Sequence, residues 1–592
     1  MASISFVDYC VLIGILLVCA LIGIFHAFRG TRQRTGKDYF LGNRNISSFP
    51  VAVSLVVSVM SAVTYLGTPV DVYMHGPKFG LMCLNKAIVA LVVTTVTLPV
   101  FYRLGVTSVY EYLDVRFNRV VRYAVVTVEI FFSTLYLGIV IYAPSLALST
   151  VTGLNLTMSI LSIGVVCTFY TTIGGMKAVI WTDVFQVAAV MMMGFILMTI
   201  VGTVKIGGIA ESWQRAVEGQ RNQLIDFNPD PTIRLSFWSI FVGGSLFSIS
   251  AMGAKQSVVQ RYNSCTTEHQ AKVAAWMGIL GLGIVEIAAV ATGMTMYGYY
   301  AYCDPLSQGI VSKPDQLIPY FIIDLFYAIP GLPGILLGGA FCASLSTMSS
   351  ILNGLAAVTG NDFIKVIWKD LPETRYLIIV KVVSVAYGTL SVVVAFLVPS
   401  LGKILQVTLS IGGIFGGPVL GVFCLGMLVR RANSFSAFIG LICGVCVGVI
   451  FQIGALFYPP SSERLPLSVE GCIADEFNVT SGVTISPEPT TVPIVYEMMT
   501  TPGILYDHVF TGRLFGISFL HYATVTSLTT LLIGIVSSFF CCGDNKDEID
   551  PLLLSPVVQR FYHDKPKSNV LPGGEEEVQM MSCQPSDKPV KV

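Results

Sequence analysis

Charged residues are scarce in this chain. Only 12% of its 592 residues are Asp, Glu, Lys or Arg, whereas soluble domains carry roughly 25%. Hydrophobic residues make up 54% of the chain, and the formal net charge is zero. This composition predicts a multi-pass membrane protein. The lack of net positive charge argues against nucleic acid as a partner.

The sequence also lacks the residue groupings that catalysis and ATP use require. It has only six histidines, none of them four residues apart, and its fourteen cysteines show no metal-type spacing. It contains no glycine-rich loop ending in Lys and Ser or Thr, the motif that cradles nucleotide phosphates. These absences argue against an enzyme, against an ATP-driven pump and against a bound cofactor.

Long apolar runs are the main feature of the sequence. A run of about 20 apolar residues is long enough to cross a membrane as a helix. Thirteen such runs occur, and they predict an all-α polytopic membrane protein. The runs lie at about 7–28, 49–75, 80–102, 121–149, 156–173, 180–204, 236–259, 273–298, 332–359, 376–398, 401–429, 434–457 and 514–540.

Basic residues gather on one side of these spans. The loops after the first and third spans are rich in Arg and Lys, and Arg430 and Arg431 fall on the same side. Loops in the cytoplasm carry such an excess of Lys and Arg. We therefore expect a membrane protein with its N-terminus outside and its C-terminus in the cytoplasm.

Two features fall on the expected outer side. Asn478 stands in Asn-Val-Thr, an acceptor sequence for N-glycosylation, within the long loop 458–513. Cys303 and Cys472 also fall outside, where they either form a disulfide or remain free thiols.

A row of hydroxyls occupies the middle of one span. Residues 325–361 carry no charge, yet five of the seven residues in 344–350 are Ser or Thr. On a helix, Ser346, Thr347 and Ser350 share one face, because residues three and four apart are neighbours. In lipid these hydroxyls need partners. They either pack against other helices or bind a small hard cation.

The second span carries a similar row. Ser54, Ser58, Ser61 and Thr64 recur at helical spacing, and Gly67 and Pro69 are expected to interrupt the helix. A discontinuous span frees backbone carbonyls that transporters use to coordinate sodium. The alternative is a hydroxyl-rich packing face between helices.

Two charged residues within or beside the spans are open to two interpretations. Asp183 stands at the expected start of the sixth span, where it either caps the helix or joins Gln186 in a cation site. Lys255 lies near the inner end of the seventh span. It either extends to the membrane interface or contacts an anionic substrate.

The motifs together identify the chain as similar to one family. It resembles the sodium:solute symporter family, which includes the sodium–glucose cotransporters. Within that family it looks closest to the branch of the sodium-coupled monocarboxylate, multivitamin and iodide transporters. The motifs are SVMSAVTYLGTP (58–69), VFYRLGVTSVYEYL (100–113), GIVIYAPSLAL (138–148), TIGGMKAVIWTDVFQ (172–186), QSVVQRY (256–262), PDQLIPY (314–320), PGLPG (330–334), SLSTMSS (344–350) and GGPVLG (416–421).

The resemblance implies a fold of about thirteen helices. Its core is an inverted repeat of five plus five helices, with broken helices at the binding sites. The implied segments are an outer N-terminus with an extra helix and inner loop (1–47), the first repeat (48–205), an outer loop (206–235), the second repeat (236–430), a peripheral helix (431–457), an outer loop (458–513), the last helix (514–540) and a disordered inner tail (541–592).

The resemblance also implies three groups of site residues. The main sodium site maps to the carbonyls of Val57, Met60 and Ala343 and the hydroxyls of Ser346 and Thr347. An additional sodium site maps to Ser58, Asp183, Gln186 and Gln256. The substrate position maps to Thr64, Tyr142 and Leu409. Lys255 departs from the branch, which usually has Asn there, and Thr64 is smaller than its counterpart in sugar and iodide carriers.

These features together predict a sodium-coupled symporter that works by alternating access. The expected substrate is a small organic anion, either a monocarboxylate or a vitamin carboxylate such as biotin or pantothenate. The alternatives are an iodide or other inorganic-anion carrier, and an uncoupled ligand-gated conductance or sensor on the same fold. The final residues, Val590 to Val592, are also typical of a PDZ-domain ligand.

Overall fold

The computed structural model describes most of the chain, and helices dominate it. The described residues are 5–29, 44–106, 108–185, 191–368, 370–400, 402–458, 464–472, 513–540 and 549–561. Within these ranges the one β-type pairing is an isolated bridge between Ile46 and Cys265. The prediction of an all-α protein is therefore confirmed.

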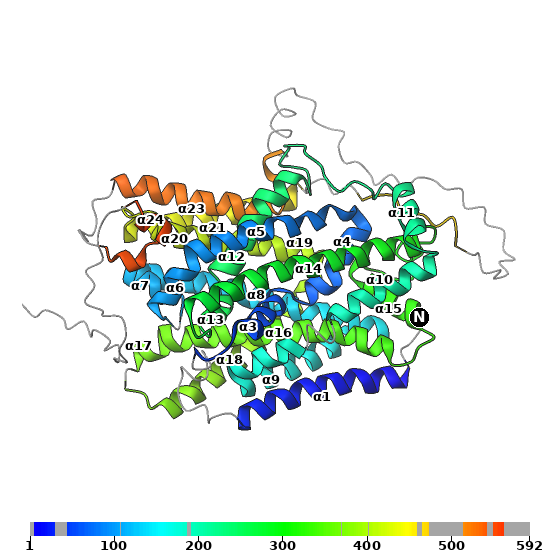
Figure 1. Cartoon of the computed structure of the whole chain (residues 1–592), viewed down its shortest axis with the longest axis horizontal. Helices are drawn as coiled ribbons and strands as arrows, with labels where there is room; N and C mark the ends of the chain where they lie inside the picture. Colours follow the sequence, from blue (N-terminus) through cyan, green and yellow to red (C-terminus); the bar gives the residue numbers. More distant parts are fainter. Residues whose placement is uncertain are drawn as a thin grey trace, which may run out of the picture.

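The helices form one bundle whose long members run roughly parallel to the long axis of the molecule (Figure 1). Eight described helical stretches are long and apolar enough to cross a membrane, or ten if two bent pairs each count as one span. The total of thirteen stays a prediction. The long unbroken helices are α1 (Phe6–Arg29), α8 (Arg119–Thr152), α9 (Leu156–Phe185), α14 (Glu268–Tyr300), α16 (Leu332–Thr359), α18 (Glu373–Ala395), α21 (Ser434–Phe457) and α23 (His521–Phe540).

Other spans are assembled from shorter pieces. They contain α- and π-helical turns in series, and several π turns directly precede a helix with Pro at its second residue. Proline lacks an N–H and clashes with the carbonyl four residues back, which favours a wider turn before it. The pieces are α3 (Ser48–Val59), η2 (Val63–Gly67), α4 (Thr68–His75), η3 (Pro77–Leu81), α5 (Met82–Val92), η4 (Val93–Thr97), α6 (Leu98–Leu104), α10 (Met192–Ile206), η6 (Ser239–Gly244), α12 (Ser245–Gly253), α13 (Gln256–Tyr262), α19 (Ile404–Ile411), η10 (Gly412–Gly416) and α20 (Gly417–Leu428).

Short helices connect or extend these spans. They lie at the ends of the bundle, in loops and in the tail. They are α7 (Glu111–Arg116), α11 (Ile209–Glu218), η7 (Pro314–Gln316), α15 (Leu317–Phe326), η8 (Gly360–Ile364), α17 (Lys365–Ile367), η9 (Val398–Ser400), η11 (Pro551–Leu553) and α24 (Pro556–Gln559).

The second span is broken, but not where the sequence predicts. α3 and the η2–α4 segment meet at 63°. The break is at Met60, whose backbone is extended, and the Ser61 hydroxyl accepts from the Val63 amide at 3.1 Å to begin the next segment. Gly67 and Pro69 lie inside that segment. Pro69 is tolerated there because the first turn of a helix needs no N–H from it.

The span 239–262 has a break of the same kind. α12 ends at Gly253, and α13 starts at Gln256. Between them Lys255 has an extended backbone, with φ −84° and ψ 130°. The first span of each expected repeat is therefore interrupted.

Helix α16 is the central element of the bundle and is buried along almost its whole length. Asp8 of α1 caps its start, because one carboxylate oxygen accepts from the amides of Gly331 at 2.7 Å and Gly334 at 3.2 Å. The Ser344 hydroxyl donates to the Val140 carbonyl of α8 at 2.7 Å. These contacts fix the height and rotation of the helix that carries the hydroxyl row.

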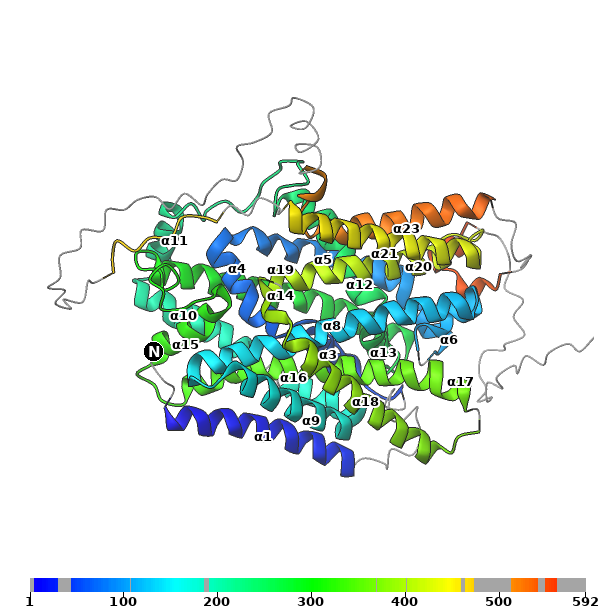
Figure 2. The ribbon, with the colours of Figure 1, turned by 180° about the vertical axis from the view of Figure 1, so that it is seen from behind.

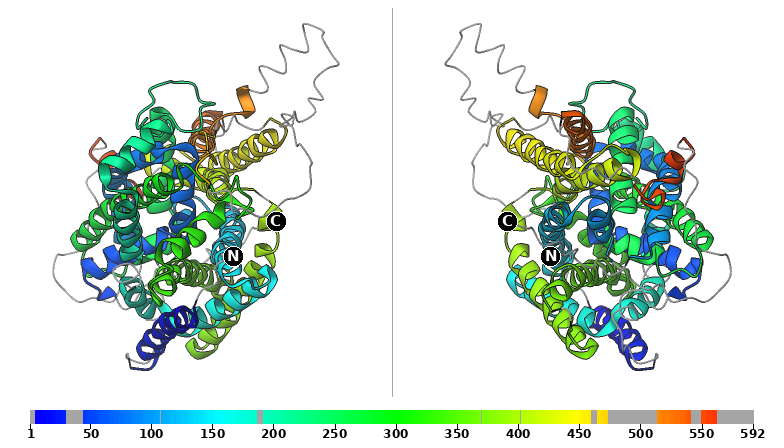
Figure 3. Two further views of the ribbon diagram at one scale, coloured as in Figure 1. Left: turned by 90° about the vertical axis from the view of Figure 1, so that its right-hand side faces the viewer. Right: turned by 90° about the vertical axis from the view of Figure 1, so that its left-hand side faces the viewer.

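The peripheral helices lie on opposite sides of this core. α1 runs along one edge of the bundle, and α21 and α23 lie along the other, as the views from behind and from the ends show (Figures 2 and 3). The interior between them holds α3, α8, α14 and α16, and these elements carry most of the buried polar residues discussed below.

A cap of loops covers the end of the bundle near α4 and α11. The structure joins Cys303 and Cys472 by a disulfide. Arg221 is fully buried in this cap: its Nε donates to the Tyr73 carbonyl at 2.9 Å, and its guanidinium lies 3.6 Å from the Tyr297 ring centre. Asn478 lies outside the described residues.

Part of the predicted disordered tail is ordered. In residues 549–561 the prediction is wrong, because Leu553 and Leu554 are buried against the bundle. The Ser555 amide donates to the Met427 carbonyl at 3.0 Å, and the Tyr112 hydroxyl donates to the Leu553 carbonyl at 3.1 Å. The apolar residues and two helix starts of this segment allow it to dock on the bundle.

The docked tail segment yields a paired test. Leu553→Asp places a charge at a 5% exposed position, whereas Leu552→Asp changes a neighbour that is 48% exposed. Losing the burial of one Leu costs about 1.5–3 kcal/mol. We expect trypsin to cut after Arg560 much faster in the purified Leu553→Asp protein than in the Leu552→Asp protein. Equal cutting rates would contradict the docking.

Candidate functional site

The broken end of α3 supplies free backbone oxygens. A helix leaves its last carbonyls without amide partners in the helix. α3 ends at Val59, so this group includes the carbonyl of Val57, and Met60 follows in an extended conformation. Both Val57 and Met60 are buried, at 0% and 3% exposed. Their carbonyls therefore have to find other partners within the protein.

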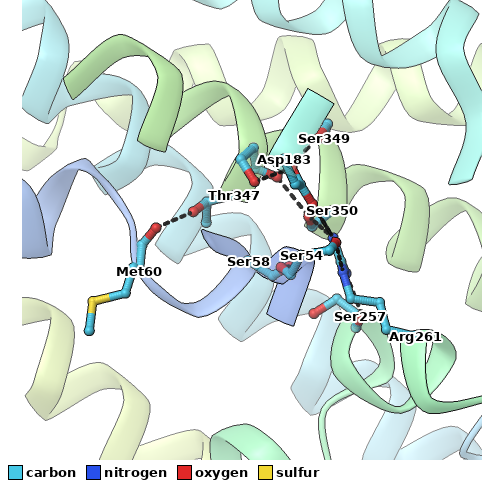
Figure 4. Close-up of polar contacts among 10 residues, drawn as sticks. Ser54, Ser58, Met60, Asp183, Ser257, Arg261, Thr347, Ser349 and Ser350 are labelled. Carbon is cyan, nitrogen blue, oxygen red and sulfur yellow. Dashed lines mark hydrogen bonds and ion pairs between the residues drawn. The ribbon is translucent and has the colours of Figure 1, made fainter. Parts of the chain in front are cut away.

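Helix α16 faces this break with its hydroxyl row. The Thr347 hydroxyl donates to the Met60 carbonyl at 3.4 Å (Figure 4). Ala343 and Ser346 lie on the same face of α16, and both are buried. The structure thus brings together Met60 and Thr347 of the predicted main sodium site, and it places the other three members on these same two elements.

The chemistry of this set suits a small hard cation. All the candidate ligands are neutral oxygens, from carbonyls and hydroxyls, which bind such an ion without holding it too tightly for release. Within the described residues no group of three or more His, Cys, Asp or Glu is positioned to hold a metal ion. A transition-metal centre therefore has no support in this part of the chain.

Asp183 ties this region to a third helix. The sequence places it at the start of a span, but in the structure α9 runs from Leu156 through Phe185, so Asp183 lies far from the start of this helix. The interpretation as an N-terminal cap is therefore wrong. Its carboxylate accepts from the Ser54 hydroxyl of α3 at 2.6 Å and from the Ser346 hydroxyl of α16.

Arg261 neutralises this carboxylate. Its Nη2 lies 3.2 Å from Asp183, and both side chains are 0% exposed. The same guanidinium donates from Nε to the Ser54 hydroxyl at 2.8 Å and from Nη2 to the Ser350 hydroxyl at 2.6 Å (Figure 4). Its Nη1 donates to the Ser257 carbonyl at 2.6 Å.

The sequence predicted only some of the residues in this network. Ser350 is on the predicted face of α16, and it serves as an acceptor for Arg261. Arg261 itself was missed as a site residue. The available signal was an Arg within the QSVVQRY motif beside an apolar span, which needs an acid such as Asp183 when buried.

The members of the predicted additional sodium site have separate partners. The Ser58 hydroxyl donates to the Ser54 carbonyl within α3. The Gln256 side-chain oxygen accepts from the Val109 amide at 2.8 Å. Gln186 lies outside the described residues. Asp183 already has the Arg261 cation beside it, so this second site stays a prediction.

A central cavity lies beside the breaks in both spans. Its volume is about 140 Å³, and its wall includes Thr64, Leu409 and Lys255. Two of the three predicted substrate residues therefore line it. Tyr142 is not part of this wall. Its hydroxyl instead accepts from the Nζ of Lys313 at 3.4 Å.

Charged side chains in the cavity wall occur in two places. Lys86 of α5 and Glu286 of α14 form an ion pair at 2.8 Å and are both almost fully buried. Lys255 and Glu129 line another part of the wall. Lys255 does not extend to a membrane interface as one interpretation of the sequence predicts, because its ammonium lies against aromatic rings at the cavity.

Comparison with known proteins gives a consistent result. The sequence model of the sodium:solute symporter family matches residues 39–444. Sodium-coupled monocarboxylate transporter 1 of Homo sapiens is 42% identical over 572 residues, covering 95% of this chain and 92% of that protein. Sodium-coupled monocarboxylate transporter 2 of Mus musculus is 39% identical, covering 94% and 87%. The sodium/iodide cotransporter of Homo sapiens is 40% identical, covering 92% and 85%.

A solved structure shares the fold. The substrate-bound outward-open state of a Na⁺-coupled sialic acid symporter matches with a TM-score of 0.70 and 24% identity, covering 91% of this chain and 98% of that chain. The predicted fold, a helical membrane protein with a five-plus-five inverted-repeat core and broken helices, is thereby confirmed apart from the number of helices.

If the carbonyl and hydroxyl oxygens of α3 and α16 bind sodium, sodium should change the thermal stability of the purified protein. Ions that bind the folded state raise its melting temperature. We expect sodium, exchanged for choline, to raise the melting temperature of the wild type. In Thr347→Val, which keeps the shape of the side chain but loses the hydroxyl, about 10-fold more sodium is expected for the same shift, equivalent to about 1.4 kcal/mol.

Thr347→Ser is the matched control because it retains the hydroxyl. Its sodium titration should follow the wild type closely. If Thr347→Val titrated like the wild type, Thr347 would not belong to a sodium site.

Proposed function

Because the chain belongs to the sodium:solute symporter family, it is a sodium-coupled solute symporter, and we propose that it imports a small monocarboxylate. Two of the similar proteins described above are named sodium-coupled monocarboxylate transporters. The observation that carries the proposal is the central cavity beside the two breaks, which is small and has a cation in its wall.

The size of the cavity favours a small acid. An apolar cavity of about 150 Å³ in another protein binds one benzene molecule, and the central cavity has a volume of about 140 Å³. Lactate, pyruvate and nicotinate are of this order of size. Biotin and pantothenate, which the sequence also suggested, are much larger, so we favour the small monocarboxylates over the vitamins.

The wall of the cavity supports a carrier of an organic anion. Apolar side chains such as Val63, Phe132 and Leu409 make up much of it, and Lys255 adds a positive charge. Such a mixture suits a solute with one apolar end and one carboxylate. A sugar has less support, because Thr64 is smaller than its counterpart in sugar carriers and would leave a sugar without one of its hydrogen-bonding partners.

Coupling follows from the location of the sodium ligands. They come from the break in α3 and from the middle of α16, so a bound ion holds these two elements together. After sodium leaves, the hydrogen bond of 3.4 Å from the Thr347 hydroxyl to the Met60 carbonyl still joins the two elements. In this account, sodium favours the conformation that accepts substrate, and its loss to the cytoplasm releases both solutes.

The net charge that crosses the membrane in each transport cycle tests how many sodium ions accompany the substrate. One sodium with one monocarboxylate moves no net charge, so the membrane potential does not drive it. A second sodium adds one net charge, worth about 2.3 kcal/mol at 100 mV. Uptake accompanied by inward current therefore supports the additional sodium site around Asp183.

Iodide is the second candidate substrate. The observation that favours it is the 40% identity to a sodium/iodide cotransporter. Like a monocarboxylate, iodide is a single negative charge. A conductance or sensor without coupling has no comparable support, and the uptake experiment below separates it from both carriers.

The cellular setting follows from the predicted topology. We place the protein in the plasma membrane, with the Cys303–Cys472 disulfide outside and the docked tail segment 549–561 inside. The suggested PDZ ligand at Val590 to Val592 lies outside the described residues.

Uptake by the reconstituted full chain tests the proposal. Lactate, nicotinate, biotin, pantothenate, iodide and glucose are compared in proteoliposomes with an inward sodium gradient, and choline replaces sodium in the control. We expect accumulation of lactate or nicotinate, at least 10-fold lower in choline, and little uptake of glucose or biotin. Accumulation that is equal in choline would contradict coupling. Current evoked by lactate without accumulation would favour the sensor.

A further inference from the structure

Lys255 stands at an unusual place for a lysine. It occupies the break between α12 and α13, where its backbone is extended, and its side chain reaches the wall of the central cavity. A cation at this depth is costly unless it has a function or a partner.

The ammonium of Lys255 is held by aromatic rings. Its Nζ lies 5.1 Å from the ring centre of Phe132 and 4.8 Å from that of Tyr136, both on α8. Such contacts stabilise a cation but leave its three N–H donors unused. In the part of the chain that the structure describes, no hydrogen bond or ion pair to this Nζ is present.

The other lysine of the cavity differs in this respect. Lys86 is neutralised by Glu286 at 2.8 Å. Glu129 lies near Lys255 in the same wall, but its Oε1 accepts from the Ser133 hydroxyl at 2.8 Å. No oxygen of Glu129 comes within 4.0 Å of the ammonium. Lys255 is therefore the cavity cation with donors available to an incoming anion.

We propose that Lys255 is the specificity-determining cation of the cavity and binds the carboxylate of the transported acid. Phe132 and Tyr136 hold the ammonium in place, and their rings offer apolar surface to the rest of the acid. The ligand class is an organic monocarboxylate with a short apolar part. This inference rests on the proposed function, because it names the group that recognises the substrate.

Paired substrates that differ only in charge test the inference. Nicotinate and nicotinamide share one ring, and lactate and lactamide share one backbone. In proteoliposomes, Lys255→Asn and Lys255→Met are expected to raise the KM for nicotinate and lactate by about 10- to 100-fold, the effect of losing one charge-assisted hydrogen bond. Lys255→Arg retains the charge and should stay within about 3-fold of the wild type.

Competition by the amides adds an independent readout. In the wild type, nicotinamide should compete poorly with nicotinate, and in Lys255→Asn this discrimination should shrink by about 10-fold or more. The double variant Lys255→Asn with Glu129→Gln removes both charges, so it avoids leaving an unpaired acid in the wall. It should show the same loss of discrimination. Retained melting-temperature response to sodium verifies that each variant is folded.

Three outcomes would overturn the inference. The first is an unchanged KM for the acids in Lys255→Met. The second is an unchanged preference for acid over amide. The third is a higher sodium Hill coefficient in Lys255→Asn with an unchanged KM, which would mean that the ammonium substitutes for a sodium ion. If the wild type carries no monocarboxylate at all, the proposed function fails instead, so the two failures are distinguishable.

Discussion

The buried ion pair between Asp183 and Arg261 is the constraint on which the site depends. Both side chains are 0% exposed, so neither charge is solvated by water. Removing one partner of such a pair typically costs 3–5 kcal/mol, because the other charge is left buried and unpaired. The pair therefore holds α9 and α13 together, and through Ser54 and Ser346 it also holds the two elements that carry the proposed sodium ligands.

The Asp183–Arg261 pair also connects the proposed sodium ligands to the packing of the helices. Ser346 is a proposed sodium ligand, and its hydroxyl also donates to Asp183. A sodium ion at Ser346 and Thr347 thus contacts the network that joins four helices. The central cavity lies next to this network, because its wall includes Ser58 to Ser61 at the break in α3. The proposed sodium site and the proposed substrate site thus share one break.

Much of this arrangement was predictable from local patterns. The charge-free hydroxyl row of α16 indicated either a packing face or an ion site, because hydroxyls in lipid need partners. The family resemblance assigned Met60 and Thr347 to a sodium site, and the structure brings these two residues into contact. The position of the break was not predictable from Gly67 and Pro69. Both residues fit within helical turns, and the structure breaks instead where Met60 is extended.

Long-range pairing explains the remaining differences. Arg261 is 78 residues from Asp183 in sequence, so their contact depends on how α9 and α13 pack. The sequence alone is compatible with Lys255 at the membrane interface. In the structure, the second break directs its side chain towards the cavity. Leu553 and Leu554 lie in a polar tail, and only the surface beside Met427 and Tyr112 gives them a place to be buried.

The central claim is that sodium bridges the break in α3 and the hydroxyl row of α16. Paired cryo-electron microscopy maps of the full chain, in sodium chloride and in choline chloride, test it most directly. The account predicts a density peak only in sodium, about 2.3–2.6 Å from the oxygens of Met60, Ala343 and Thr347, the range for a hard cation of this size bound by oxygen. Identical maps with no peak at these oxygens would contradict it.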